Sequence, residues 1–331
     1  MSAPYPWQRT AWARFAQARA AGRLAHAWLL SGPAGVGKRD FAHAVAAALL
    51  CTTPTADGGA CGRCRGCRTR AAGHHPDWRH VAPAEPRKPI RVDQIRELAE
   101  FLGGTAQFGG DKVVLIEPAE QMNVNAANSL LKTLEEPPPH SVLLLVSECP
   151  GQLPATVRSR CQGLAFPVPP AEEAGAWLAA QEGADDAGTL LALAGGAPLR
   201  ARALRAALPR RRGLFDAFAE LVGGRADPVR TAEIWAEGAL PEALDWLVGW
   251  HQDMIRLTMA GTPPRLANPD VGATLRRLAA GVPAVFLFER LDAAVRAREL
   301  ATTTQANTTL LLEEFFIGWA GAAAARAARG A

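Results

Sequence analysis

The chain has 331 residues, of which 49% are hydrophobic and 21% charged, and its formal net charge is +4. This composition is typical of a soluble globular protein and excludes a disordered chain, while the length predicts two or three domains. Because the sequence has no run of about 18 apolar residues and no basic-then-apolar leader, we expect a cytoplasmic protein without a membrane span.

Short apolar runs alternate with helical patterns in the first half of the chain, which predicts an α/β fold with a parallel sheet covered by helices. The run "HAWLLSG" is expected to be a buried strand, and "KRDFAHAVAAALL" a helix with Phe41, Val45 and Leu49 on one face. Further strands are expected in "DKVVLIE" and "SVLLLVSE", and further helices in "IRVDQIRELAEFL" and "NAANSLLKTLEEPPP".

Composition changes at "FPVPP", after which almost every segment has the pattern of an Ala- and Leu-rich helix. We therefore predict an α/β domain over residues 1–167, a small all-α domain over 168–209 and a longer all-α domain over 210–331. The last boundary rests on a break expected from Pro209 to Gly213. Aromatic residues of the last domain are expected in its core: Trp246, Trp250, Phe315, Phe316 and Trp319.

The stretch "SGPAGVGKRD" fits the phosphate-loop pattern G-x-x-x-x-G-K-[ST] up to its last position, where Arg39 replaces the hydroxyl residue. In such a loop, backbone N–H groups surround the phosphates and the lysine reaches the terminal ones. The candidate cofactor-binding residues are Gly32, Gly35, Gly37 and Lys38. Arg39 is a cation with donors only and cannot ligate Mg²⁺. Either the loop binds an anion without hydrolysing it, or it is only a tight turn; ATP binding stays open.

The acidic pair that a nucleotide hydrolase carries after a downstream strand is also depleted. The stretch "KVVLIEPAE" supplies Glu117, but Pro118 follows it, and the next acid is Glu120. Proline has no group that could polarise water. Glu117 could equally be an acidic strand end that faces solvent. Two losses in one candidate active site favour a protein that does not hydrolyse nucleotides.

Four cysteines lie close together in an insert over residues 51–67, with the spacing C-x9-C-x2-C-x2-C: Cys51, Cys61, Cys64 and Cys67. Clustered thiols in a reducing compartment favour metal binding over disulfides, and four thiolates match structural Zn²⁺. An iron–sulfur cluster and free thiols are the alternatives. His74 and His75 could replace a ligand, although a loop is the simpler interpretation. The surrounding Arg63, Arg65, Arg68 and Arg70 could contact DNA or a partner, or form a solvated basic face.

The second arginine of "TVRSRC" is Arg160, and this stretch follows the strand "SVLLLVSE" and a proline-containing turn. Arg160 at a domain edge could reach a neighbour's nucleotide as an arginine finger, which stabilises charge on the transferred phosphoryl group. An ordinary surface ion pair is the alternative.

Taken together, these motifs resemble bacterial clamp-loader subunits of the AAA+ superfamily. The shared stretches occur in the same order: "HAWLLSGPAGVGK", the four-cysteine insert, "HPDW", "IRVDQIREL", "ANSLLKTLEEPPP", "ATVRSRC" and "QANTTLLLEEFFIGW". The resemblance covers the chain nearly end to end. It implies an AAA+ core with a zinc module, followed by an all-α lid and an all-α collar that holds a ring of subunits together.

The resemblance implies a role in DNA replication, in a ring that loads the sliding clamp onto primed DNA as part of the DNA polymerase III holoenzyme. That holoenzyme is a DNA-directed DNA polymerase, a nucleotidyltransferase, but no polymerase site and no ATPase activity are expected in this chain alone. The implied partners are the tau/gamma motor subunits and the delta subunit, with the sliding clamp and primer–template DNA bound through the assembly. Arg160 would act in trans on ATP held by a motor subunit.

The departures from the motor subunits favour a stator that does not hydrolyse ATP. Motor subunits keep the hydroxyl and the Asp-Glu pair that Arg39 and Pro118 replace here. Arg200 in "GGAPLRA" is one position away from the motor's ATP-sensing arginine, and an ordinary surface role is the alternative. The competing functions are an ATP-hydrolysing motor of tau/gamma type and a zinc-containing DNA-binding protein whose phosphate loop is a relic.

Overall fold

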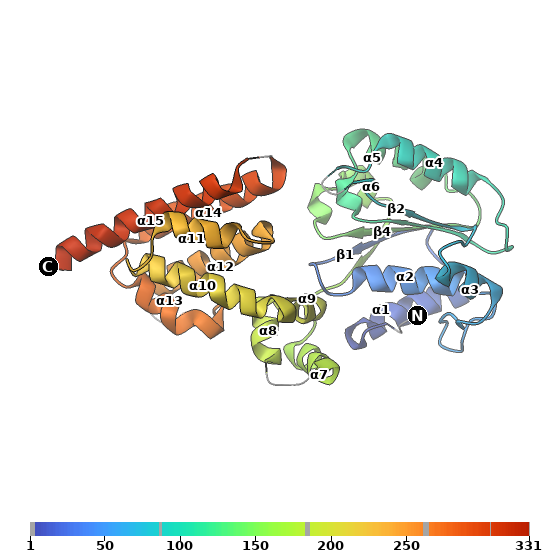
Figure 1. Cartoon of the computed structure of the whole chain (residues 1–331). Coiled ribbons are helices and arrows are strands. Elements are labelled where there is room, and N and C mark those ends of the chain that lie inside the picture. The colour runs from blue at the N-terminus through green and yellow to red at the C-terminus, as the bar shows by residue number, and fades with distance from the viewer. Residues whose placement is uncertain (1–3, 86–87, 183–185, 261–264, 305, 331) are drawn as a thin grey trace. The chain divides into compact units, whose positions relative to one another are not determined.

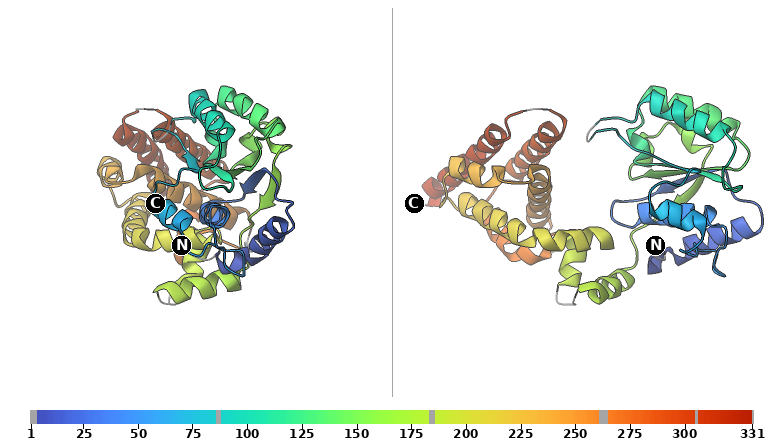
Figure 2. Two further views of the ribbon diagram at one scale, coloured as in Figure 1. Left: turned by 90° about the vertical axis from the view of Figure 1, so that its right-hand side faces the viewer. Right: turned by 45° about the vertical axis from the view of Figure 1, so that its right-hand side comes forward.

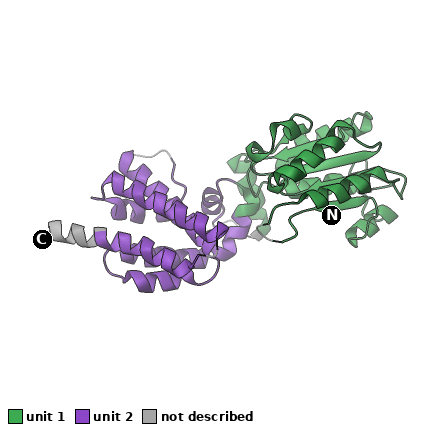
Figure 3. Ribbon diagram, turned by 90° about the horizontal axis from the view of Figure 1, so that it is seen from above, with its two compact units in different colours: residues 1–181, 197–200 green, residues 182–196, 201–331 purple. Residues whose placement is uncertain are grey.

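The computed structural model describes residues 4–85, 88–182, 186–260, 265–304 and 306–330. The chain forms two compact units, coloured separately in Figure 3. The first consists of Met1–Gln181 with Ala197–Arg200, and the second of Glu182–Gly196 with Ala201–Ala331. The small helical domain expected over residues 168–209 has residues in both units, so its boundaries stay a prediction.

The first unit is built on a five-stranded sheet in which all neighbouring strands pair in parallel, in the order β2-β3-β4-β1-β5. This confirms the expected α/β fold. The strands are β1 (Ala27–Ser31), β2 (Trp78–Val81), β3 (Lys112–Ile116), β4 (Ser141–Ser147) and β5 (Gln162–Ala165). Strands β3 and β4 are buried throughout because both faces of the sheet are covered. The sequence did not predict β2 and β5, since these edge strands are partly exposed and lack a continuous apolar run.

Helices cover both faces of the sheet, as Figure 1 shows. Helices α1 (Arg9–Ala20) and α2 (Lys38–Leu49) pack with Trp28 and Leu30 of β1 on one face. On the other face, α4 (Val92–Gly103) and α5 (Val124–Glu135) pack with Leu29, because successive side chains of a strand point to opposite faces. The unit also contains shorter elements and a later helix: η1 (Pro6–Gln8), α3 (Arg65–Ala71), η2 (Ala119–Gln121), η3 (Pro150–Gln152), α6 (Ala155–Arg158) and α7 (Ala171–Glu182).

In the second unit every described element is helical, which agrees with the sequence-based prediction (Figure 2). Its elements are α8 (Ala187–Leu193), η4 (Arg205–Ala207), α10 (Leu208–Val222), α11 (Pro228–Ala236), α12 (Leu240–Met259), η5 (Pro269–Val271), α13 (Gly272–Ala279), α14 (Ala284–Thr303) and α15 (Thr308–Gly330). Helix α9 (Pro198–Leu204) belongs to both units. The break expected from Pro209 to Gly213 is wrong, because these residues lie in the first turns of α10. Proline is tolerated there, since the first N–H groups of a helix have no partner within it.

Buried aromatic residues form the centre of the second unit, as predicted, with Trp235, Trp250 and Trp319 almost fully enclosed. His251 lies among them without solvent exposure. The Trp319 indole donates to His251 Nε2 at 3.0 Å. Because an indole N–H can only donate, Nε2 must accept, and Nδ1–H donates to the Leu247 carbonyl at 2.7 Å. His251 is therefore neutral, and burial lowers its pKa to about 4.

No helix in the described parts of the chain combines the length and the apolar character needed to cross a membrane.

Candidate functional site

The phosphate-loop stretch lies between β1 and α2, at the carboxyl end of a central strand of the sheet. Gly35 and Gly37 have φ values of 77° and 85°, which L side chains rarely adopt. A Cβ atom on Gly35 would come within 2.7 Å of Arg200 Cβ, and one on Gly37 within 2.6 Å of the Tyr5 ring. Both glycines are therefore required by conformation and by close packing. The loop has the strand–turn–helix context that a phosphate loop needs.

Lys38 does not extend into solvent from this loop. Its residue is 4% exposed, and its ammonium group donates to the Pro33 carbonyl of the same loop at 2.7 Å. Burial lowers the pKa of Lys38, although Glu148, Glu120 and Glu117 lie close enough to oppose this shift. The lysine is thus held by a carbonyl of its own loop.

Side chains from the N-terminal segment fix the outer side of the loop. Gln8 is 1% exposed, and its amide donates to the carbonyls of Val36 and Gly37 at 3.1 and 2.9 Å. The Trp7 indole also donates to the Val36 carbonyl, at 2.9 Å. The sequence did not predict these contacts, because "YPWQ" does not indicate which distant backbone groups its side chains contact.

Arg39 points toward the acidic strand end rather than away from it. Arg39 Nε lies 3.2 Å from Glu117 Oε2, and His80 Nε2 lies 3.6 Å from the same oxygen. The Glu117 side chain is only 16% exposed, so the alternative that it faces solvent is wrong. An arginine cation therefore pairs with the carboxylate that follows β3.

Glu120 is engaged in a structural contact of its own. Its Oε1 accepts the backbone N–H groups of Glu148 and Cys149, at 2.9 and 3.3 Å. The carboxylate thereby fixes the chain just beyond β4. Neither acid of "KVVLIEPAE" is left without a protein partner.

The four cysteines of the insert converge, and their sulfur atoms all lie within 4.8 Å of one another. The Cys51–Cys64 and Cys61–Cys67 Sγ distances are 3.8 and 4.0 Å. A tetrahedral ion with bonds of about 2.3 Å would place its sulfur ligands about 3.8 Å apart, so the cluster has the size of a four-thiolate metal site.

Hydrogen bonds around the sulfurs also suit thiolates. The backbone N–H groups of Cys61, Cys64 and Cys67 point at neighbouring sulfurs, at 3.3 to 3.4 Å. The Thr53 hydroxyl donates to Cys61 Sγ at 3.2 Å and is the largest cause that lowers the pKa of Cys61, to about 7. The cluster can therefore hold a metal ion, and the donor set fits Zn²⁺.

In the described structure, the cysteine cluster includes neither His74 and His75 nor the arginines in and just after the insert. His75 is buried, and its Nδ1 accepts the backbone N–H of Asp77 at 3.1 Å. Arg70 is half-buried, with its guanidinium 5.1 Å from the Trp78 ring centroid, so it does not belong to a solvated face. Arg65 lies over Phe108 at 4.5 Å. Exposed positions are kept by Arg63, Arg65 and Arg68.

Arg160 lies just before β5, after the short helix α6. On either side of it, Val157 is fully buried and Cys161 packs against the core formed with α4 and α5. The Arg160 side chain is 36% exposed. Its Nη2 lies 2.6 Å from Glu135 Oε1 at the end of α5, and its Nη1 donates to the Thr156 carbonyl at 3.1 Å.

Arg160 and the phosphate loop lie at opposite ends of the strands. We call the side of the sheet at which the strands begin its amino edge and the side at which they end its carboxyl edge. Strands β1 and β5 pair in parallel, with Trp28 beside Gln162 and Ser31 beside Ala165. The loop follows Ser31, whereas Arg160 comes before Gln162. The loop is therefore at the carboxyl edge and Arg160 at the amino edge, so Arg160 is not placed to contact an anion in its own loop.

Arg200 lies at the phosphate loop through its backbone. The Leu199 N–H donates to the Gly35 carbonyl at 3.0 Å, which sets α9 against the loop. A sensor role for the Arg200 side chain stays a prediction.

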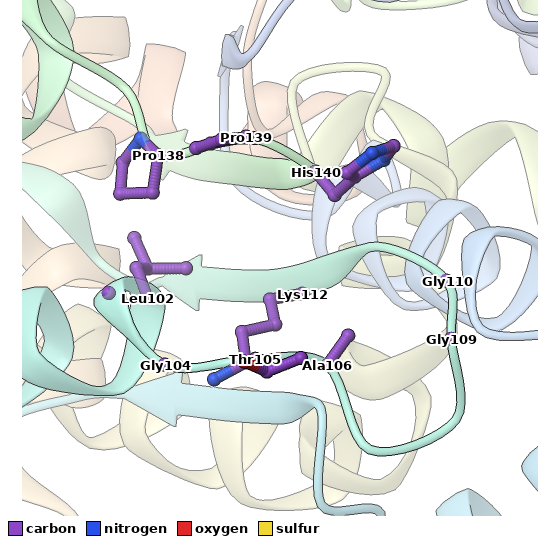
Figure 4. Close-up of a pocket in the computed structure, with 11 residues that line it drawn as sticks. Leu102, Gly104, Thr105, Ala106, Gly109, Gly110, Lys112, Pro138, Pro139 and His140 are labelled. Carbon is purple, nitrogen blue, oxygen red and sulfur yellow. The ribbon is translucent and has the colours of Figure 1, made fainter.

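A cavity of about 350 Å³ lies at the amino edge, between the chain segments around Gly104, Gly110 and Pro138 (Figure 4). Lys112 lines it and is 7% exposed. Its ammonium donates to the Phe101 carbonyl in the last turn of α4 at 2.5 Å and lies 4.4 Å from the Phe101 ring centroid. Lysine commonly caps helix C-termini in this way, so Lys112 has a structural role.

Comparisons with known proteins agree over nearly the whole chain. A family model described as DNA polymerase III, delta subunit matches residues 7–170, and one described as DNA polymerase III, delta subunit, C terminal matches residues 206–321. The chain is 41% identical to DNA polymerase III subunit delta' of Pseudomonas aeruginosa, covering 96% of this chain and 97% of that protein. It is 30% identical to delta' of Haemophilus influenzae, covering 94% and 95%. With DNA polymerase III subunit tau of Escherichia coli it shares 39% identity over 42% of this chain and 21% of that protein.

Proposed function

Because the chain belongs to the family of DNA polymerase III delta' subunits, we propose that it is a clamp-loader stator that does not hydrolyse ATP. In this role it supplies Arg160 to ATP bound by a neighbouring motor subunit. The ring would load the sliding clamp onto primed DNA, and the chain would act in the cytoplasm beside tau/gamma and delta subunits.

The observation that carries the trans role is the placement of Arg160 at the amino edge of the sheet, opposite the phosphate loop of the same chain. A guanidinium group that stabilises charge on a transferred phosphoryl group must lie next to it. The nucleotide that Arg160 serves would therefore be held by another chain. Its partial exposure of 36% leaves the group accessible to such a partner.

The pairing of Arg39 with Glu117 supports the absence of hydrolysis. Metal-assisted phosphoryl transfer needs a hydroxyl and a carboxylate that are free to hold Mg²⁺. Here the hydroxyl is replaced by a cation, and that cation lies 3.2 Å from the carboxylate. A divalent ion in this position would meet a positive charge in place of a ligand.

The four-cysteine cluster is proposed to hold structural Zn²⁺. The sulfur separations fit tetrahedral coordination by four thiolates, and such a site leaves no open position for catalysis. The ion would tie Cys51, just after α2, to Cys64 and Cys67 at the start of α3. An iron–sulfur cluster is the alternative that metal analysis would reveal.

We also propose that residues 168–209 act as a lid and residues 210–331 as the collar that joins the ring. Exposed apolar side chains on the last two helices support an interface: Phe288 of α14 and Leu310 and Ile317 of α15 are 47%, 59% and 53% exposed. Apolar surface of this kind is often covered by a partner.

The arginine role can be tested in a ring reconstituted with delta and motor subunits. The motor subunits would carry alanine in place of their own finger arginine, so that only the site facing this chain hydrolyses ATP. Arg160→Ala should lower kcat at that site by about a thousandfold or more, whereas the exposed neighbour Arg158→Ala should leave it unchanged. Turnover that is indifferent to Arg160→Ala would exclude the trans role.

The stator role is tested on the purified chain, which should not turn over ATP. Turnover that disappears in Lys38→Ala would identify the chain as a motor instead.

A further inference from the structure

We propose that Glu135 is a positioning residue that holds the Arg160 guanidinium in the orientation from which it reaches the neighbour's phosphate. This inference rests on the proposed function of Arg160. The contact that carries it is the distance of 2.6 Å between Arg160 Nη2 and Glu135 Oε1. The two residues come from different elements, the segment after α6 and the last turn of α5.

The guanidinium is held at two points and still keeps donors for a ligand. Nη2 pairs with Glu135, and Nη1 donates to the Thr156 carbonyl at 3.1 Å. Guanidinium has five N–H donors in a fixed plane, so these two contacts define the plane without using all of the donors. A phosphate oxygen can therefore be bound while Glu135 remains in contact.

The backbone below the guanidinium is anchored as well. Val157 has no solvent exposure, and Cys161 packs against the core that α5 helps to form. The Arg160 N–H donates to the Val157 carbonyl at 3.2 Å. With backbone and head group both fixed, little rotamer freedom remains to be lost when the phosphate is bound.

The position of Glu135 at the end of α5 does not by itself favour an acidic residue. Carboxylates are unfavourable in the last turn of a helix, because the free carbonyl groups there carry partial negative charge. Three prolines, Pro137 to Pro139, follow the helix closely, and His26 Nε2 lies 3.1 Å from the Leu134 carbonyl as a donor. The contact that offsets the unfavourable placement of Glu135 is its pairing with Arg160.

Glu136 provides a matched control for Glu135. It is the next residue at the same helix end and is also exposed, but the contact with Arg160 is made by Glu135. Replacing either glutamate by alanine removes one negative charge from the end of α5. The two variants differ in the loss of the Arg160 contact.

The test uses the ring in which only the site facing this chain hydrolyses ATP, with Glu135→Ala, Glu136→Ala, Arg160→Ala and the Glu135/Arg160 double variant. An ion pair of this exposure favours one geometry by a factor of about two to five. We expect Glu135→Ala to lower kcat by that factor with an unchanged KM for ATP, and Glu136→Ala to match the wild type. In the Arg160→Ala background, Glu135→Ala should have no further effect.

The outcomes separate the inference from the function on which it rests. If Arg160→Ala leaves turnover unchanged, the finger itself is refuted. If Arg160→Ala lowers turnover by about a thousandfold while Glu135→Ala matches the wild type, the finger stands and the positioning role is wrong. The positioning role is equally wrong if Glu135→Ala raises kcat, if Glu136→Ala lowers it as much, or if the double variant shows additive losses.

Discussion

Acidification should destabilise the second unit through His251, a histidine of α12 that is enclosed by Phe218 of α10 and by Phe315 and Trp319 of α15. In the folded chain its Nε2 accepts the Trp319 N–H, so a proton on Nε2 would face another donor. Burial lowers the pKa of His251 to about 4 from an ordinary value of 6.5. Because the folded state has the lower pKa, its stabilisation is complete above about pH 6.5 and is lost as the pH falls toward 4.

The size of this effect follows from the two pKa values. Between pH 7.5 and pH 5, a histidine with pKa values of about 6.5 unfolded and about 4 folded lowers the free energy of unfolding by about 2 kcal/mol. His251→Gln keeps an acceptor for Trp319 but does not titrate. The wild type should therefore lose about 2 kcal/mol more than His251→Gln between these pH values.

Urea unfolding of the two proteins at pH 7.5 and pH 5, followed by tryptophan fluorescence, measures this difference. NMR of the imidazole in the folded chain gives an independent value for its pKa. Equal pH dependence of the two proteins, or an imidazole that titrates near pH 6.5, would refute the reasoning.

Three other predictions concern the cysteine cluster, the lysine of the phosphate loop and a buried arginine of the second unit. The reduced chain should contain one zinc ion, and Cys64→Ser should lower both its metal content and its thermal stability. Metal analysis that finds iron, or full metal retention by Cys64→Ser, would contradict the zinc site. Lys38→Met should leave the free energy of unfolding unchanged or raise it, because the substitution removes a buried ammonium group whose pKa is lowered by burial. A large loss of stability in urea unfolding would show that the hydrogen bond to Pro33 outweighs the cost of burying the charge. Replacing Arg211 of α10 by methionine should lower the free energy of unfolding by about 1–3 kcal/mol, because the buried Asn268 Oδ1 would lose the guanidinium donor that now lies at 2.7 Å. A loss below about 0.5 kcal/mol in urea unfolding would show that this contact contributes little.

Several parts of the fold could be predicted because their patterns are local. The apolar runs of β1, β3 and β4 are continuous, since strands buried on both faces need apolar residues at every position. Helices α2, α4 and α5 show helical spacing and end where expected. The spacing of the four cysteines likewise indicated a metal site before their sulfur atoms were located. The edge strands β2 and β5 lacked such a pattern because they are half exposed.

The missed and mistaken features depend on residues that are distant in sequence. Pro209 suggested a break, but a proline in the first turn of a helix is compatible with α10. Glu117 had two interpretations until the structure placed Arg39 beside it. No periodicity links Gln8 to the loop carbonyls or Glu135 to Arg160, because such contacts arise only when the register of the sheet brings separate segments together.

The sequence by itself therefore determined most of the helices and strands, the phosphate-loop pattern with its missing hydroxyl, the cysteine spacing that predicts a metal site and the family resemblance. Each of these features depends on neighbouring residues or on fixed spacings along the chain. Only the tertiary structure decided that Arg39 pairs with Glu117 and that Arg160 lies at the edge of the sheet opposite the loop. The physical reason is that parallel pairing places strand ends on defined edges, and the positions of these side chains follow from that pairing.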